Sequence, residues 1–163
     1  MNIWKLACES LLNLENEGFA VRTYRQRLDI ILEFVAWSVH VVDRLADQCL
    51  EEQGRRTLII ALAARLMSTL HDNNMDIGNQ KMTAEHFAVV IDKRGDAYAQ
   101  CRFNAEEGPG FTLRRLLGDH VQEHIVDTPD DKDRQWLPDY VLEQEAPAIY
   151  RGIEKTLESL LAD

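Results

Sequence analysis

Histidine is the side chain best suited to bind a transition metal or to transfer a proton near neutral pH, and this chain of 163 residues has five. His120 and His124 are four residues apart in a segment with helical periodicity, so we expect them on one face of a helix. A pair at this spacing can hold a transition metal ion. In the zincin motif glutamate directly follows the first histidine, whereas Val121 stands there in this chain. His120 and His124 are therefore a candidate metal site, and a solvated helix face beside an acidic linker is the alternative.

A second candidate combines His40 with the dipeptide His71-Asp72, which closes the apolar segment ARLMSTL. This order resembles the signature of the HD-domain phosphohydrolases, helical metal enzymes with the pattern His…His-Asp…Asp. The resemblance covers residues 40–72. It implies a metal-dependent hydrolase of phosphate esters, with His40, His71 and Asp72 as ligands of a transition metal ion that activates water.

The sequence around these residues departs from that family at three points. Asn73-Asn74-Met75 follows His71-Asp72, where the family usually has an apolar residue, glycine and lysine. His40 is expected in the middle of a helix rather than near its start. The last aspartate is not fixed by a motif, because four residues compete for that place: Asp92, Asp96, Asp119 and Asp127. The alternative interpretation, which we favour, places His40 on the polar stripe of a helix and leaves His71-Asp72 as the end of the next helix.

The segment that has to position His40 is a long helix, predicted at about residues 22–52. Between Leu28 and Cys49 apolar residues cover most of the helical circumference. The polar residues fall on one narrow stripe: Asp29, Glu33, His40, Asp43, Arg44 and Asp47. A helix that is apolar nearly all round needs packing partners on several sides. We therefore predict that this helix is the centre of the fold.

The other apolar segments also follow helical periodicity, and no segment alternates convincingly with the period of a strand. We predict one domain spanning residues 1–163, an all-α bundle of about six to seven helices packed around the long central helix. Gly18 is expected to end the first helix, Gln53-Gly54 to form the turn after the central helix, and Thr83 to cap the fourth helix. Gly95 within that fourth helix predicts a close helix crossing.

Two further regions bear on the helix boundaries. Residues 71–80, HDNNMDIGNQ, have the composition of a loop. A helix is expected to start near Trp136 with Pro138 at its first position. Because proline disfavours helical geometry in the residue before it, we expect a kink or a break at Pro147.

Composition limits the classes of partner. The chain has a formal net charge of −10 and a pI near 4.9, which opposes binding to nucleic acid or to an anionic membrane surface. The three cysteines, Cys8, Cys49 and Cys101, are widely spaced and form no CxxC pair. Free thiols indicate a reducing compartment, so we expect a cytoplasmic protein. No uninterrupted apolar run reaches the ~20 residues that a membrane span needs.

No complete catalytic motif accompanies the predicted bundle. We therefore expect a non-catalytic interaction or regulatory module, without a cofactor, that self-associates as a homodimer or binds another protein. The two terminal helices carry large apolar side chains that could close either the core of the monomer or a dimer interface: Trp4, Leu11, Tyr150, Ile153, Leu157 and Leu160. The HD-like phosphohydrolase with a transition metal ion is the alternative. A small-ligand pocket near Glu33, Trp37 and His40 is a third possibility.

Overall fold

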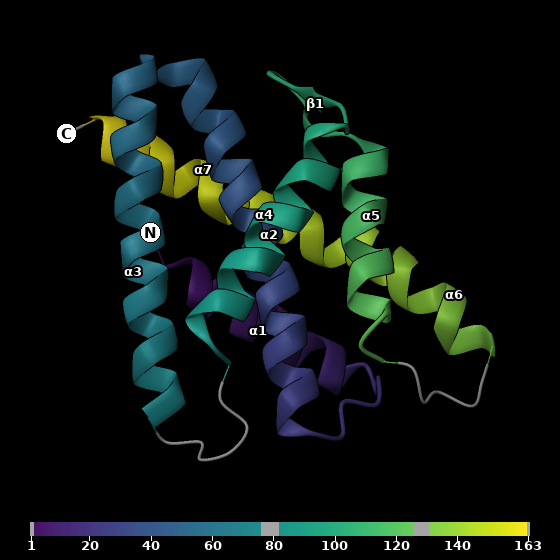
Figure 1. The fold of residues 1–163 in the computed structure, drawn as a ribbon. Helices are drawn as coiled ribbons and strands as arrows, with labels where there is room; N and C mark the ends of the chain where they lie inside the picture. Colours follow the sequence, from purple (N-terminus) through teal and green to yellow (C-terminus); the bar gives the residue numbers. More distant parts are fainter. Residues whose placement is uncertain (1, 76–81, 126–130, 163) are drawn as a thin grey trace.

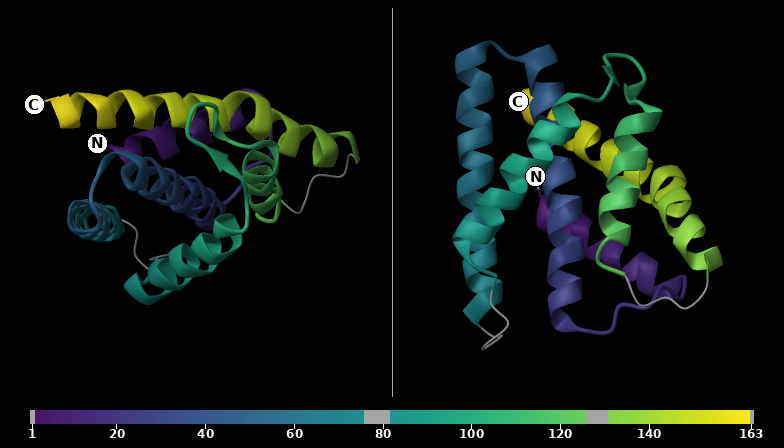
Figure 2. Two further views of the ribbon diagram at one scale, coloured as in Figure 1. Left: turned by 90° about the horizontal axis from the view of Figure 1, so that it is seen from above. Right: turned by 45° about the vertical axis from the view of Figure 1, so that its right-hand side comes forward.

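The computed structural model describes residues 2–75, 82–125 and 131–162, and it is an all-α bundle around one long helix, α2 (Tyr24–Cys49) (Figure 1). Five helices pack directly against α2, and α6 packs against α5 (Figure 2). The bundle around a central helix, predicted from the sequence, is confirmed. The other helices are α1 (Ile3–Asn16), α3 (Glu52–Met75), α4 (Ala84–Ala99), α5 (Phe111–Gln122), α6 (Asp131–Tyr140) and α7 (Ala146–Ala162).

The ends of α2 follow from capping and turn chemistry. The Thr23 side chain accepts a hydrogen bond from the Gln26 amide, and the Gln26 side chain accepts one from the Thr23 amide, which is a capping box. The predicted turn at Gln53-Gly54 is wrong. The chain turns at Leu50, whose backbone is extended, and Gly54 lies inside α3. Glu52 begins α3 and places a negative charge at its N-terminus, where the helix dipole favours one.

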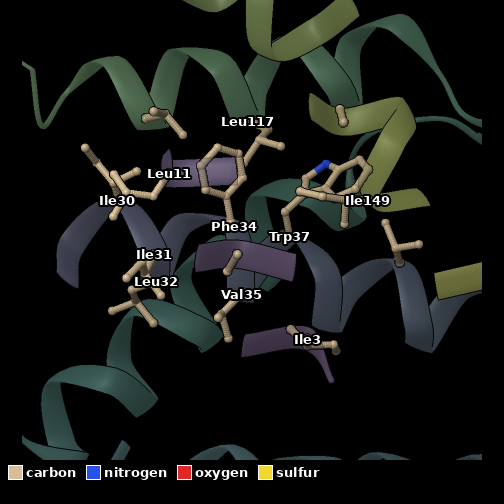
Figure 3. Packing of buried hydrophobic residues seen from close by; sticks show 14 of the residues in the cluster. Ile3, Leu11, Ile30, Ile31, Leu32, Phe34, Val35, Trp37, Leu117 and Ile149 are labelled. Carbon is tan, nitrogen blue, oxygen red and sulfur yellow. The ribbon is translucent and has the colours of Figure 1, made fainter. Parts of the chain in front are cut away.

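The core surrounds Trp37 of α2, whose side chain is fully buried (Figure 3). Its indole N–H donates to the Leu113 carbonyl of α5 over 3.2 Å, so the ring is buried without an unsatisfied donor. Burying one large apolar side chain contributes about 1.5–3 kcal/mol, and α2 buries such side chains on nearly every side. The buried apolar residues of α2 are Leu28, Ile30, Ile31, Leu32, Phe34, Val35, Ala36, Trp37, Val41, Val42, Leu45 and Ala46.

Two glycines have a structural role, one at a helix end and one at a close contact between helices. Gly18 has a φ of +90° and follows the C-cap residue Glu17 of α1, as predicted for the residue that ends this helix. The close helix crossing predicted at Gly95 is wrong, because a Cβ atom built there meets nothing within 4 Å. The close crossing is at Gly118 of α5, where a Cβ atom would lie 2.7 Å from the Pro138 carbonyl oxygen of α6.

The C-terminal helices form one continuous helical run over the described residues 131–162. Pro138 lies inside α6 rather than at a first helical position, so its predicted place is wrong; close packing against α5 outweighs the local preference of proline. A π-helical turn, η2 (Val141–Glu145), joins α6 to α7, and the Ala146 amide donates to the Val141 carbonyl, five residues back. This wider turn carries the helix past Pro147, which has no amide to donate, and the chain does not break there.

The segments between the helices agree with the sequence predictions only in part. Thr83 caps α4 as predicted, because its side chain accepts a hydrogen bond from the His86 amide. The loop predicted for residues 71–80 is helical as far as Met75, and residues 76–81 lie outside the described residues. The acidic linker is expected over residues 127–133. Residues 127–130 lie outside the described residues, and the prediction is wrong for residues 131–133, which form the first turn of α6. A two-stranded hairpin, β1 (Phe103–Asn104) with β2 (Gly108–Pro109), was not predicted, because strands of two residues have no alternation to recognise.

Within the part of the chain that the structure describes, no helix has the length and apolar character needed to cross a membrane. The three cysteines are free thiols.

Candidate functional site

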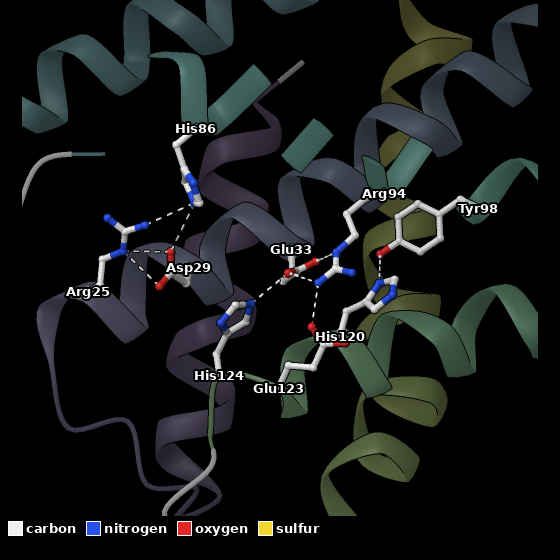
Figure 4. Close-up of polar contacts among 9 residues, drawn as sticks. All are labelled: Arg25, Asp29, Glu33, His86, Arg94, Tyr98, His120, Glu123 and His124. Carbon is white, nitrogen blue, oxygen red and sulfur yellow. Dashed lines mark hydrogen bonds and ion pairs between the residues drawn. The ribbon is translucent and has the colours of Figure 1, made fainter. Parts of the chain in front are cut away.

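The main polar cluster of the interior is centred on Glu33 of α2, whose side chain is only 2% exposed (Figure 4). Arg94 of α4 donates from Nε to one carboxylate oxygen and from Nη2 to the other, both over 2.8 Å. Nε2 of His124, just past the end of α5, lies 2.8 Å from the same carboxylate. At the rim, Glu123 accepts a second hydrogen bond from Arg94 Nη2 over 2.9 Å. One buried carboxylate therefore ties three segments of the chain together.

The charges of this cluster stabilise one another. Burial alone would raise the pKa of Glu33, but the hydrogen bonds from His124 and Arg94 outweigh burial, and the pKa lies below its usual value. Burial would likewise lower the pKa of Arg94, yet its hydrogen bond to Glu33 and the nearby negative charges raise the pKa. Glu33 is therefore an ionised carboxylate at neutral pH, and its partner is a permanent cation.

A second buried contact joins the same helices. The hydroxyl of Tyr98, one turn after Arg94 on α4, shares a hydrogen bond of 3.0 Å with Nδ1 of His120 on α5. Burial raises the pKa of Tyr98 well above its usual value, and burial together with the charge of Arg94 lowers the pKa of His120. The contact is therefore between two neutral groups.

Beside Glu33 lies a hollow of about 160 Å³ where α2, α4 and the end of α5 meet. On its other side, Nε of Arg25 donates to both carboxylate oxygens of Asp29 over 3.0 Å, and Arg25 Nη2 lies 3.2 Å from Nε2 of His86 (Figure 4). Acidic and basic groups alternate around the hollow, with two apolar side chains between them. It is lined by Arg25, Asp29, Leu32, Glu33, His86, Val90, Lys93, Arg94 and His124.

His40 lies elsewhere, in an open groove of about 650 Å³ between α2, α3 and α4. Its side chain is 9% exposed, and its buried Nε2 has no hydrogen-bond partner among the described residues. Its ring centroid lies 5.7 Å from that of Tyr98. Burial lowers the pKa of His40 to about 4, and the positive charge of Arg44 acts in the same direction. His40 is therefore a neutral histidine at pH 7.

The structure places the other HD-like candidates in a different part of the molecule. His71 and Asp72 are exposed on the last turns of α3, and Asp72 lines a hollow with Trp4 and Arg65 that does not include His40. Over residues 2–75, 82–125 and 131–162, no three histidine, cysteine or acidic side chains are grouped so as to hold a metal ion. The metal site of His40, His71 and Asp72 stays a prediction.

His120 and His124 contact different partners, Tyr98 and Glu33. His120 is 6% exposed, so it does not lie on a solvated helix face, and His124 has already left the helix. The structure does not bring Glu33, Trp37 and His40 together in one pocket. Glu33 lines one hollow, His40 lines another, and Trp37 is part of the core.

Sequence reasoning missed Arg94, the partner that makes Glu33 tolerable in the interior. A signal was present, because a carboxylate within an otherwise apolar central helix requires a cation or several hydrogen-bond donors. The chain contains 18 lysines and arginines, and nothing local selects the one that is 61 residues away.

Comparisons of the chain with protein-family models, with curated proteins and with solved structures found no match. Function is therefore inferred from the contacts within the chain.

The cluster predicts unequal effects for its two glutamates, although both accept from Arg94 Nη2. Glu33→Gln leaves Arg94, whose side chain is only 11% exposed, short of its counter-charge, which should lower the free energy of unfolding by about 3–5 kcal/mol. Glu123→Gln removes the charge of a side chain that is 57% exposed and should cost about 0–1 kcal/mol. Urea unfolding at pH 7 measures both values. Equal losses in the two variants would contradict the central place given to Glu33.

The buried neutral His40 predicts an acid-sensitive fold. Below pH ~6.5 the unfolded chain protonates this histidine, whereas the folded state resists protonation until about pH 4. Stability from this group is therefore fully present above pH ~6.5 and falls by about 3 kcal/mol as the pH drops to about 4. His40→Leu should flatten the pH dependence of unfolding measured in urea between pH 7 and pH 4.5. The same slope in the variant and the parent protein would show that His40 is not the group responsible.

Proposed function

We propose that this protein is a non-catalytic helical interaction module that self-associates through the outward face of α3. The observation that carries the proposal is the composition of this helix. Its central segment, TLIIALAARLM, contains Arg65 as its only charged residue, yet α3 lies at the edge of the bundle, where the left view of Figure 2 shows it nearly end-on. A helix at the surface of a monomer usually has a polar outer face.

Only one side of α3 is used within the monomer. Leu62, Leu66 and Leu70 are buried, whereas Ile60 is 69% exposed. Ala61, Ala63 and Ala64 continue the exposed apolar surface after Ile60, and the exposed Arg56 and Thr57 border it one turn before. Small side chains allow two helix backbones to approach closely, and a single large side chain can fill the space between them. This combination favours a second helix as the partner of α3.

A second copy of the chain fits the charge of this surface. The whole chain carries −10, and two such molecules repel each other. Between residues 52 and 72, however, α3 has three arginines, Arg55, Arg56 and Arg65, against two acidic residues, Glu52 and Asp72. This stretch by itself therefore has a net charge of +1, although Arg55 pairs with Asp43 and Asp47 of α2. Contact along α3 meets less repulsion than contact between the more acidic parts of two chains. A two-fold axis through α3 would place the same patch on both sides of the interface.

Most large apolar side chains of the terminal helices pack within the monomer. Leu11, Ile153 and Leu157 are buried within the monomer, so they close its own core. The exposed ones are Leu12 of α1 and Leu160 and Leu161 of α7, at 54%, 53% and 45%. An interface through the C-terminal end of α7 is therefore the competing arrangement for a dimer.

The non-catalytic part of the proposal is supported by how the ionisable groups are used. Both oxygens of Glu33 and the Nδ1 atom of His120 are engaged in contacts inside the protein. The pKa of His40 lies near 4, well away from the value near 7 at which general acid–base catalysis is most effective.

The proposal predicts that Ile60→Glu abolishes self-association. At tens of micromolar, sedimentation velocity should give twice the chain mass of 18.8 kDa for the parent protein and a single chain for the variant. The variant should retain the helical circular dichroism of the parent protein, because Ile60 is exposed. Leu160→Glu is the matched control and should remain a dimer. A parent protein of 18.8 kDa would refute self-association, and dissociation by Leu160→Glu alone would move the interface to α7.

A further inference from the structure

Three basic side chains converge on the hollow beside Glu33, although the chain as a whole is strongly acidic. Arg25 comes from α2, and Lys93 and Arg94 come from α4. Asp29 and Glu33 supply two negative charges, so the lysine, arginine and acidic side chains of the lining sum to a formal charge of +1. Glu123, which lies at the rim and pairs with Arg94, brings the wider cluster to zero. The chain carries −10, so this is a distinctly less acidic region than the molecule around it.

The acceptors in the hollow are already used, and several donors are not. The Glu33 oxygens accept two hydrogen bonds from Arg94, and one of them also contacts His124. Both Asp29 oxygens accept a hydrogen bond from Nε of Arg25. Nη1 of Arg25 and Nη1 of Arg94 contact no acceptor among the described residues. The Lys93 ammonium has no ion-pair partner among these residues either. The hollow therefore has a surplus of charged N–H donors.

We infer that this hollow binds a small oxyanion of the phosphate class, with Lys93, Arg25 and Arg94 as its charged contacts. A volume of about 160 Å³ is below the range of pockets for larger organic ligands and suits a group of a few heavy atoms. Arginine and lysine are the residues that proteins use to bind phosphate oxygens. Leu32 and Val90 form the apolar part of the wall, which lowers the local dielectric constant and strengthens the attraction.

The inference is independent of the proposed self-association, because α2, α4 and the end of α5 line the hollow while the proposed interface is on α3. Inorganic phosphate alone, titrated into the protein at constant ionic strength in a calorimeter, tests it directly. We expect saturable binding of one phosphate per chain. Lys93→Gln should weaken binding at least tenfold, because it removes one charge-assisted contact to the anion. Lys93 is exposed, so this variant should keep the fold.

Lys5→Gln is the matched control, since Lys5 is an exposed lysine of α1 that pairs with Glu9, and it should bind phosphate like the parent protein. Phosphoserine as a second titrant distinguishes a phosphate monoester from free phosphate as the ligand. If it binds more tightly than inorganic phosphate, and this binding again depends on Lys93, the site is assigned to phosphate monoesters. Equal or weaker binding assigns the site to the free ion. Ile60→Glu should still bind phosphate, so that failure of either proposal is recognised separately. No saturable heat, or unchanged affinity in Lys93→Gln, would overturn the inference.

Discussion

A carboxylate that is almost completely removed from water is the constraint on which the arrangement of α2, α4 and α5 depends. An ionised Glu33 in a largely apolar core would cost several kcal/mol if it had no partners. Arg94 and His124 offset this cost only when α4 and the end of α5 lie at the level of Glu33 along α2. One turn further along α4, Tyr98 reaches His120 and fixes the same two helices at a second point. Apolar packing is non-directional, so these directional contacts set the register of the helices.

The surroundings of α2 and α3 explain why two apolar helices have different roles. α2 is covered on nearly every side by α1, α3, α4, α5 and α7, so its apolar character is used within the monomer. α3 packs mainly against α2, with a smaller contact to α1, and its outer side remains apolar around Ile60. The proposed oxyanion hollow lies on the side of α2 that faces α4 and α5. A ligand there and a partner on α3 would therefore contact different faces of the same central helix.

The sequence predicts the parts of this structure that depend on local pattern. The apolar circumference from Leu28 to Leu45 identifies the central helix, and Thr23, Thr83 and Gly18 mark helix ends because capping depends on neighbouring residues. Periodicity also groups Glu33 with His40 on one stripe, but it does not reveal that both are buried, since the groups that cover them come from α3, α4 and α5. For the same reason the spacing of His40 and His71 resembles a metal-binding signature, while the fold places them beside different hollows. The close approach of Gly118 to Pro138 likewise depends on tertiary packing that no local pattern records.

The coupling between Glu33 and Arg94 tests the central claim most directly. A double-mutant cycle compares the unfolding free energies of the parent protein, Glu33→Gln, Arg94→Gln and the double variant in urea at pH 7. If the pair sets the register of the bundle, the second substitution should cost little once the first is made, which gives a coupling energy of about 2–3 kcal/mol. Additive losses, with a coupling below about 0.5 kcal/mol, would contradict the account.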